Sequence, residues 1–452
     1  MKHIFYAFAL LFLVTSCGKD DEASTPLTPE PENPVPQNTA PELADQSFTV
    51  AENITDTTVI GTITATDTEE DALTYSLTTN SNDLFVLTET GELSLATGKL
   101  LNYDVAQTHT LTIEVTDATN TTTANITITI TNSPDVYIVG SEYNGTGTMA
   151  TLWKNGVATI LSDIYSRAYD IAISGEQVYI AGSIENSGLQ EATLWKNETA
   201  ITLSNAGNRA EAKSVSITET GNVYIAGYEH VENYSESYVK VWNENGQLAF
   251  ATLPSINVTS NNYIGWSGSS SCLYTTGSDV YVTGFERFGN GINRATLWRN
   301  GIPEVIEEVN HPNPNSIYPN SVYVSGTNTY VAGSKNEGIP SATLWKNGEK
   351  TKLSNSNNIA NANSVYVSGN DVYVVGKEWF GTHFVATLWK NDEVIRLTDI
   401  ADSSTASAVF VLENDVYIVG SIAGKATLWI NGEGRALSNA TSSHAYGLFV
   451  KP

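Results

Sequence analysis

From residue 38 onwards the chain alternates apolar and polar residues, and short clusters of glycine, asparagine and aspartate interrupt the alternation. The segments 109–117 (HTLTIEVTD), 124–132 (ANITITITN) and 371–376 (DVYVVG) show the pattern clearly. Because successive side chains of a strand point to opposite faces, this alternation predicts half-buried β-strands. No apolar stripe with a helical period runs for any length. The pattern therefore predicts an all-β protein.

Residues 38–132 hold about seven such segments, each bounded by turn residues. About seven short strands in a segment of this size are typical of a two-sheet sandwich of immunoglobulin-like size. We therefore expect a β-sandwich over residues 38–132.

The same segment carries an ordered series of short motifs. They are N-T-A-P-E-L from residue 38, F-T-V-A-E-N from 48, A-T-D-T-E-E-D-A-L-T-Y from 65, F-V-L-T-E-T-G-E-L from 85, L-N-Y-D from 101 and I-E-V-T-D from 113. In this order they resemble the motifs of cadherin-like repeats, over the whole segment. The resemblance implies an extracellular module and allows self-association with a second copy.

The cadherin resemblance also implies Ca²⁺ binding, for which clustered oxygen ligands are required. It places Glu52, Asn102 and Asp104 at the C-terminal end of the sandwich, and Asp67, Glu69 and Asp117 nearer the N-terminal end. Asn102 stands where the family motif has an aspartate, no D-x-N-D-N linker follows, and the chain has one repeat. The alternative is that these acids are ordinary surface turn residues.

Two markers alternate from residue 135 to the end of the chain, and each occurs seven times. One is V-Y-x-x-G or a close variant, from residues 135, 177, 222, 279, 328, 371 and 415; the other is A-T-L-W-K-N-G or a variant, from 150, 192, 239, 295, 342, 386 and 426. Each unit yields four strands at a period of about 40 to 50 residues, which is the signature of a propeller blade. The sequence therefore predicts a seven-bladed β-propeller over residues 133–452. The repeats also loosely resemble the W-x-N-G-bearing HAF-type repeats of bacterial extracellular proteins.

The first unit lacks its innermost strand, and the final residues AYGLFVKP match that strand type. We expect the C-terminal strand to complete the first blade, so that the ring has no open sheet edge.

The seven repeat tryptophans occupy one fixed position in each unit. They are Trp153, Trp195, Trp242, Trp298, Trp345, Trp389 and Trp429. These tryptophans could form an aromatic platform for sugars, or they could pack between adjacent blades. Their fixed position in every unit favours packing.

Variation between the units collects in two classes of connection, which lie on one face of a propeller. Variable loops on a rigid scaffold commonly carry binding sites. The candidate ligand-binding residues there are Tyr143, Tyr228, Glu229, Trp266, Phe285, Glu286, Glu378 and Trp379. The aromatic rings could stack on sugars, and the glutamates, together with Glu142, are expected to face a common axis. The alternative is scattered aromatic residues on a solvated acidic rim.

An apolar run of eleven residues, 4–14, follows Lys2 and His3. It is shorter than the roughly 20 residues that a membrane-spanning helix needs, and it fits a secretory signal. The run ends in L-V-T-S-C-G, which resembles a bacterial lipobox, and K-D-D-E after it resembles the surface-export signal of Bacteroidetes lipoproteins. The resemblance implies a signal peptide over residues 1–17, lipidation of Cys17, a proline-rich disordered tether over 18–37 and attachment to the outer membrane at the cell surface.

Composition narrows the function classes. The formal charge of −27 disfavours nucleic acid and anionic membrane surfaces. With Cys17 lipidated, Cys272 has no partner for an intrachain disulfide, and its strand-like surroundings favour buried packing. No G-x-S-x-G, phosphate-binding loop or cysteine-rich metal motif is present. We therefore expect a surface lipoprotein for binding or adhesion, whose propeller face meets a glycan or protein. The alternative is a carbohydrate-active hydrolase or lyase that uses carboxylates and aromatic residues of that face, with no catalytic residue assigned.

Overall fold

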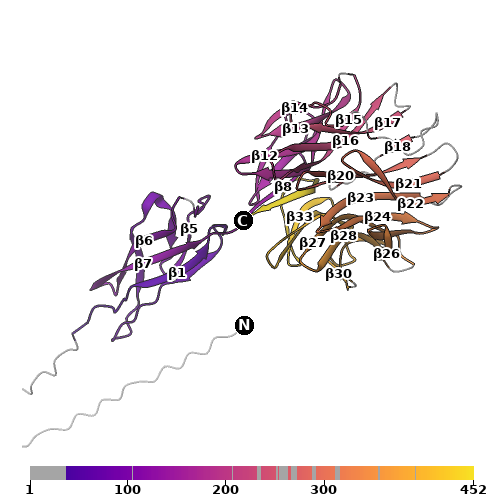
Figure 1. Cartoon of the computed structure of the whole chain (residues 1–452). Helices are drawn as coiled ribbons and strands as arrows, with labels where there is room; N and C mark the ends of the chain where they lie inside the picture. The colour runs from indigo at the N-terminus through magenta and orange to yellow at the C-terminus, as the bar shows by residue number, and fades with distance from the viewer. Residues whose placement is uncertain are drawn as a thin grey trace, which may run out of the picture. The chain divides into compact units, whose positions relative to one another are not determined.

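A computed structural model describes residues 37–452, apart from residues 104, 206, 232–235, 251–252, 254–262, 266–271, 288–291, 311–315, 355–356 and 392. Cys17, the signal segment and nearly all of the tether lie outside the described residues. The chain divides into two compact units, Met1–Asn132 and Ser133–Pro452 (Figure 1). The described residues form β-strands and one short 3-10 turn, η1 (Ser81–Asp83), so the prediction of an all-β protein is confirmed.

The first unit is a two-sheet sandwich with the seven strands expected in its described part. One sheet has the order β1 (Gln46–Ala51), β7 (Thr121–Thr131), β6 (Thr108–Thr116) and β3 (Thr74–Thr79); the other has the order β2 (Val59–Thr62), β5 (Glu92–Leu95) and β4 (Phe85–Leu87). β1 runs parallel to β7, and the other pairs are antiparallel. Alternate residues of β6 and β7 point inward, which leaves Ile113, Ile126 and Ile128 fully buried.

The second unit contains seven sheets in its described residues, which we number as blades 1 to 7. Blade 1 is β35 (Ser443–Lys451), β8 (Asp135–Tyr143), β9 (Thr148–Lys154) and β10 (Val157–Ile160); blade 2 is β11 (Ser166–Ser174), β12 (Gln177–Asn186), β13 (Leu189–Lys196) and β14 (Thr199–Thr202); blade 3 is β15 (Ala210–Ile217), β16 (Val223–Val231) and β17 (Glu236–Asn243). Blade 4 is β18 (Tyr263–Gly265), β19 (Leu273–Thr276), β20 (Asp279–Arg287), β21 (Ile292–Arg299) and β22 (Ile302–Asn310).

The last three blades have four strands each. Blade 5 is β23 (Ser316–Ser325), β24 (Asn328–Asn336), β25 (Pro340–Lys346) and β26 (Glu349–Lys352); blade 6 is β27 (Ala360–Ser368), β28 (Asp371–Phe380), β29 (His383–Lys390) and β30 (Glu393–Arg396); blade 7 is β31 (Ser404–Leu412), β32 (Asp415–Ile422), β33 (Lys425–Ile430) and β34 (Glu433–Ala436). Blade 3 departs from the four-strand expectation: among described residues its outer strand is an isolated bridge between Trp242 and Leu248.

The C-terminal strand takes the place predicted for it in the first blade. β35 pairs antiparallel with β8, so the two ends of the propeller chain share one sheet (Figure 1). The innermost strands contact one another in the order β11, β15, β19, β23, β27, β31, β35, and β35 contacts β11. These contacts run once around the ring and return to their start.

The glycine of the V-Y-x-x-G marker is explained by a bulge in the neighbouring inner strand. In blade 7 the register shifts between Ala406 and Ala408, which brings the carbonyl of Thr405 against Gly420. A Cβ atom on Gly420 would lie 1.9 Å from that oxygen, and five other blades repeat this contact at 1.9 to 2.2 Å, at Gly140, Gly182, Gly227, Gly333 and Gly376. Only glycine allows so close an approach of two backbones.

The tryptophan and asparagine of the W-K-N-G marker have separate structural roles. The seven repeat tryptophans are almost fully buried, and each packs in the cluster of the preceding blade, as Trp195 does against Val139 of blade 1. The asparagine takes a left-handed conformation in the turn between the third and fourth strands, with φ of 51° at Asn155. Its side chain accepts from the N–H of Val136 at 2.8 Å and donates to Asp135 at 2.7 Å. The packing interpretation of the marker is therefore confirmed.

We predict that Gly420→Ala destabilises the propeller by about 1–3 kcal/mol or more, because the new methyl group overlaps a backbone oxygen that cannot move alone. Denaturant unfolding of the full chain measures the loss. Ser421→Ala, which changes the next residue of the same strand, is the matched control. Equal losses in the two variants would contradict the bulge explanation.

Candidate functional site

The residues predicted at the N-terminal end of the sandwich lie in two acidic loops, one with Asp67 and Glu69 and the other with Asp117. Asp117 accepts hydrogen bonds from the N–H groups of Thr119 at 2.7 Å and Asn120 at 2.6 Å, and these bonds, against the effect of burial, hold its pKa below the usual value. Asp67 accepts from the N–H groups of Glu69 and Asp71 at 3.0 and 3.1 Å.

The segment at residues 38–39 links these two acidic loops. Glu69 accepts from the hydroxyl of Thr39 at 2.8 Å, and the side chain of Asn38 is hydrogen-bonded to Asp117. Two oxygen atoms there, Oδ1 of Asn38 and Oδ2 of Asp67, are buried and have no hydrogen-bond partner within the described part of the chain. Carboxylate and amide oxygens are the ligands that Ca²⁺ takes.

At the opposite end, Glu52 lies against the loop that carries Asn102. Oε2 of Glu52 accepts from the N–H of Tyr103 at 2.8 Å, and the side chain of Asn102 caps the N–H of Val105 at 3.1 Å. Asp104 lies outside the described residues. Both polar side chains are thus engaged with the backbone of this loop. Across the described ranges, no group of three or more His, Cys, Asp or Glu side chains is arranged to hold a metal ion.

The sequence predicts that the glutamates of the variable face point to a common axis, whereas the structure shows three of them buried and bonded within their blades. Glu229, Glu286 and Glu378 are each about 1–2% exposed. Glu229 accepts from the N–H of Asn205 at 3.1 Å and from the amide of Asn208 at 3.0 Å, both in the connection that leads into its own blade. Each glutamate is therefore enclosed in the scaffold, on a different blade.

Glu378 and Glu142 are bonded in the same way, each to a residue of the connection that leads into its own blade. Glu378 accepts from Asn358 at 2.9 Å, and Glu142 accepts from the hydroxyl of Ser438 at 2.7 Å. Glu286 differs, because it accepts from the hydroxyl of Thr296 at 2.6 Å and lies 3.8 Å from Arg294. The sequence could not show these bonds, since the partners come from connections of irregular length.

The predicted aromatic residues are spread over four blades. Tyr143 in blade 1 is 40% exposed, and its hydroxyl donates to the carbonyl of Gly145 at 2.9 Å. Phe285 is buried against Tyr318, and Trp379 contacts Phe384 edge to face at 5.0 Å. Trp266 lies outside the described residues. Together with Tyr228 of blade 3, the described candidates lie on four different blades and do not form one patch.

Tyr228, the remaining predicted residue, lies in a buried polar cluster that the sequence did not reveal. The cluster joins Glu211 and Lys213 of β15 in an ion pair, with the ammonium group 3.5 Å from the ring centroid of Tyr169. Burial opposes the charge of Lys213, but Tyr169 and Glu211 raise its pKa above the usual value. Desolvation also acts against ionised Glu211, whose pKa is nevertheless lowered by Lys213. Tyr169 lies on β11, and Glu211 and Lys213 lie on β15. They meet because the propeller places these two inner strands side by side.

The inner strands carry a second unpredicted feature, an arc of aromatic rings at equivalent positions of five consecutive blades. Successive ring centroids are 4.6 to 5.5 Å apart along Tyr274, Tyr323, Tyr366, Phe410 and Phe449. Blades 2 and 3 place Ala172 and Ser216 at this position. Tyrosine or phenylalanine at one fixed position of a repeat was the signal in the sequence.

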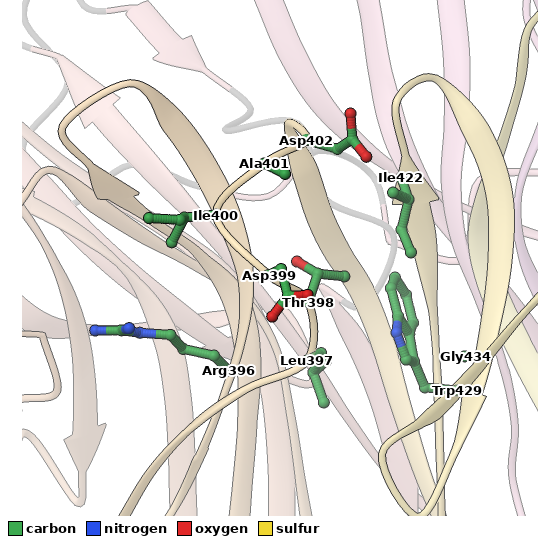
Figure 2. A pocket seen from close by; sticks show the side chains of 10 residues that line it. All are labelled: Arg396, Leu397, Thr398, Asp399, Ile400, Ala401, Asp402, Ile422, Trp429 and Gly434. Carbon is green, nitrogen blue, oxygen red and sulfur yellow. The ribbon is translucent and has the colours of Figure 1, made fainter.

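A groove of about 850 Å³ opens on the variable face between blades 6 and 7 (Figure 2). Residues 396–402, which end β30 and lead into β31, form one side, and Ile422, Trp429 and Gly434 of blade 7 form the other. Asp399 and Asp402 are exposed. The volume falls in the range of small-molecule sites. We call this cavity the blade 6–7 groove; none of its residues was among the candidates from the sequence.

Asp170 of β11 joins blade 2 to blade 3. Its Oδ2 atom accepts from the hydroxyl of Ser214 at 2.6 Å and from the N–H of Val215 at 3.0 Å. Burial outweighs these bonds and raises the pKa of Asp170 to about 7. The single cysteine among the described residues, Cys272, is buried at the matching position of blade 4, as expected.

Comparison with known proteins bears on the first unit. Residues 46–131 match the model of the cadherin domain. A human mucin-like protocadherin EC1-2 structure is 22% identical over 22% of this chain and 56% of its own length, with a TM-score of 0.20. The third cadherin domain of human protocadherin 7 is 17% identical over 23% of this chain and 96% of its own, with a TM-score of 0.20. The family match makes the first unit cadherin-like. This chain covers about half of the length of the first of these structures.

A structure that matches over most of the chain is a quinonprotein alcohol dehydrogenase-like protein from Bacteroides thetaiotaomicron. It is 11% identical over 91% of this chain and 99% of its own, with a TM-score of 0.38. No curated protein matches the chain. Within the part of the chain that the structure describes, no helix has the length and apolarity to cross a membrane.

We predict that Asp170 makes the propeller less stable as the pH rises from 4 to 7. Its folded-state pKa of about 7 lies above the unfolded value of 3.8, so its stabilisation is complete below pH 4 and is lost as pH rises through 7. The slope reaches at most about 1.4 kcal/mol per pH unit. Unfolding by denaturant at pH 5 and pH 8 should show this component in the wild type and in Asp163→Asn, a surface control, but not in Asp170→Asn. Identical pH slopes in all three proteins would count against it.

Proposed function

We propose that the chain is a lipid-anchored surface protein of the bacterial outer membrane that binds a glycan or a protein through the variable face of its propeller. The observation that carries the binding proposal is the blade 6–7 groove, because it opens on the face where the connections vary and the scaffold beneath is regular. The anchor rests on the L-V-T-S-C-G motif at Cys17, and metabolic labelling with palmitate tests it directly.

The cadherin domain supports the extracellular part of this proposal and suggests Ca²⁺ as its cofactor. Asn38, Asp67, Glu69 and Asp117 would hold the ion at the N-terminal end of the sandwich, where two buried oxygen atoms of Asn38 and Asp67 have no described partner. Ca²⁺ would supply positive charge between these loops and fix the entry of the tether.

The hydrolase alternative gains no support from the glutamates of the variable face. Glycoside hydrolysis uses two carboxyl groups about 5–10 Å apart, on either side of the scissile bond. Glu229, Glu286 and Glu378 are buried, lie in blades 3, 4 and 6, and are bonded to the scaffold. These glutamates therefore do not supply the pair of carboxyl groups, and binding is the function that we propose.

We predict that Ca²⁺ raises the melting temperature of the first unit and that EDTA reverses the rise. A ligand at about 100 times its dissociation constant adds about 2.7 kcal/mol, which corresponds to roughly 10 °C or more for a unit of this size. Calorimetry of the full chain measures the shift. Asp67→Asn and Asp117→Asn should reduce it, whereas Glu89→Gln, a change in an exposed turn of the same unit, should keep it. A melt that is the same with Ca²⁺ and with EDTA would remove the calcium proposal.

We predict that the full chain retains oligosaccharides on an array and leaves them intact. Incubation followed by mass spectrometry distinguishes binding from turnover, because a hydrolase or lyase would release shorter products. Shortened products formed by the wild-type chain would favour the enzyme alternative instead.

A further inference from the structure

The blade 6–7 groove combines an indole N–H without a described partner, a glycine that faces this indole and two exposed carboxylates. We infer that it is a subsite for a neutral saccharide, with a ligand oxygen accepting from the indole N–H of Trp429 and ligand hydroxyls donating to Asp399 and Asp402. The inference deepens the proposed function and rests on its premise that the variable face binds a ligand.

The side chain of Trp429 is buried, but its indole N–H is not sealed from the groove and has no protein partner among the described residues. Trp429 is 1% exposed, and no residue in the described part of the chain accepts from it. In blade 2 the equivalent Trp195 donates to the carbonyl of Leu161 at 3.2 Å, and in blade 5 Trp345 donates to Glu307 at 2.8 Å. An indole N–H that is open to the groove and has no protein acceptor can donate to a ligand oxygen.

Access to this donor comes from Gly434. Gly434 lies across from Trp429 in β34, and a Cβ atom there would lie 2.8 Å from the indole nitrogen. The residue facing the repeat tryptophan has a side chain in the other paired outer strands, namely Ala158, Ala200, Pro303, Lys350 and Val394. The indole nitrogens of Trp153 and Trp389 also lack a described partner, but both are sealed from solvent. Among the blades with a paired outer strand, the open donor is therefore a property of blade 7.

The junction between blades 1 and 2 is a natural comparison. Its connection reads L-S-D-I from Leu161, and that between blades 6 and 7 reads L-T-D-I from Leu397. In the first, the leucine carbonyl accepts from Trp195. In the second, the leucine lines the groove and its tryptophan has no such bond. Two connections of nearly the same sequence therefore differ in structure: one accepts the hydrogen bond of the repeat tryptophan, and the other does not.

The chemistry of the lining selects the class of ligand. Asp399 and Asp402 are exposed carboxylates with no hydrogen-bond partner among described residues. In Figure 2, Asp402 lies above Trp429 and Asp399 lies across from it. Carboxylates accept from hydroxyl groups and the indole donates to a ligand oxygen, while Ile400 and Ile422 offer apolar surface to the C–H face of a sugar ring.

Anionic sugars are disfavoured by the two acids and by the net charge of −27. A bare cation is disfavoured by Arg396 and the indole donor.

The test uses the full chain and an array of neutral oligosaccharides built from hexoses and N-acetylhexosamines, beside uronate-bearing oligosaccharides and short peptides. Asp399→Asn combined with Asp402→Asn should weaken binding of the neutral sugars at least about tenfold, because charge-assisted hydrogen bonds are lost. Gly434→Ala, which covers the indole nitrogen, should weaken it similarly. Asp163→Asn, at the matched position between blades 1 and 2, should bind like the wild type. Melting curves check folding, and the exposed aspartates keep the test valid if Gly434→Ala is unstable.

Three results would overturn the inference. Neutral sugars that bind equally to the wild type and both groove variants would place the sugar site elsewhere and leave the proposed function standing. Peptide binding that the groove variants abolish, without sugar binding, would make the occupant a protein. Absence of binding to every probe would remove both the subsite and the glycan part of the proposed function.

Discussion

The burial of each repeat tryptophan against the preceding blade is the contact on which the propeller depends. A single four-stranded blade leaves an apolar face uncovered, and the neighbour's tryptophan covers it, as Trp429 does with Val375 of blade 6 and Trp153 with Val419 of blade 7. Because every blade both gives and receives this contact, no blade completes its core alone. The repeat preserves the residues that make this contact and the backbone approaches beside it, and the connections are free to differ.

The fold could be predicted from the sequence because every blade needs the same few residues at the same positions. The marker glycine reports a close backbone approach, the marker asparagine a turn with positive φ, and the tryptophan a packing position. Each of these is local to two or three adjacent strands, so alternation and spacing are sufficient to infer it. The outer strand of blade 3 escaped the rule, since only an isolated bridge at Trp242 remains in its described part.

The site was harder to predict, and the glutamates show why. Position in a repeat indicates which strand Glu229 or Glu378 belongs to, but it does not indicate what an irregular connection brings against it. These carboxylates accept hydrogen bonds from Asn205, Asn208 and Asn358, which lie in the connections. Acids that were expected at the surface therefore hold the connections in place. The blade 6–7 groove was missed for the opposite reason: it arises from a residue without a side chain, Gly434, and from a bond that is made between blades 1 and 2 but not there. Absence of a group leaves little signal in one sequence.

Pairing of β35 with β8 has a consequence for the order in which the molecule matures. β8 is the first strand of the propeller to be synthesised and β35 is the last, so blade 1 has an unpaired edge while the roughly three hundred residues between them are being made. An unpaired edge is a template for association with other chains. Blades 2 to 7 can assemble progressively during synthesis. The ring loses its last unpaired edge only when the nine-residue strand β35 has been made and pairs with β8.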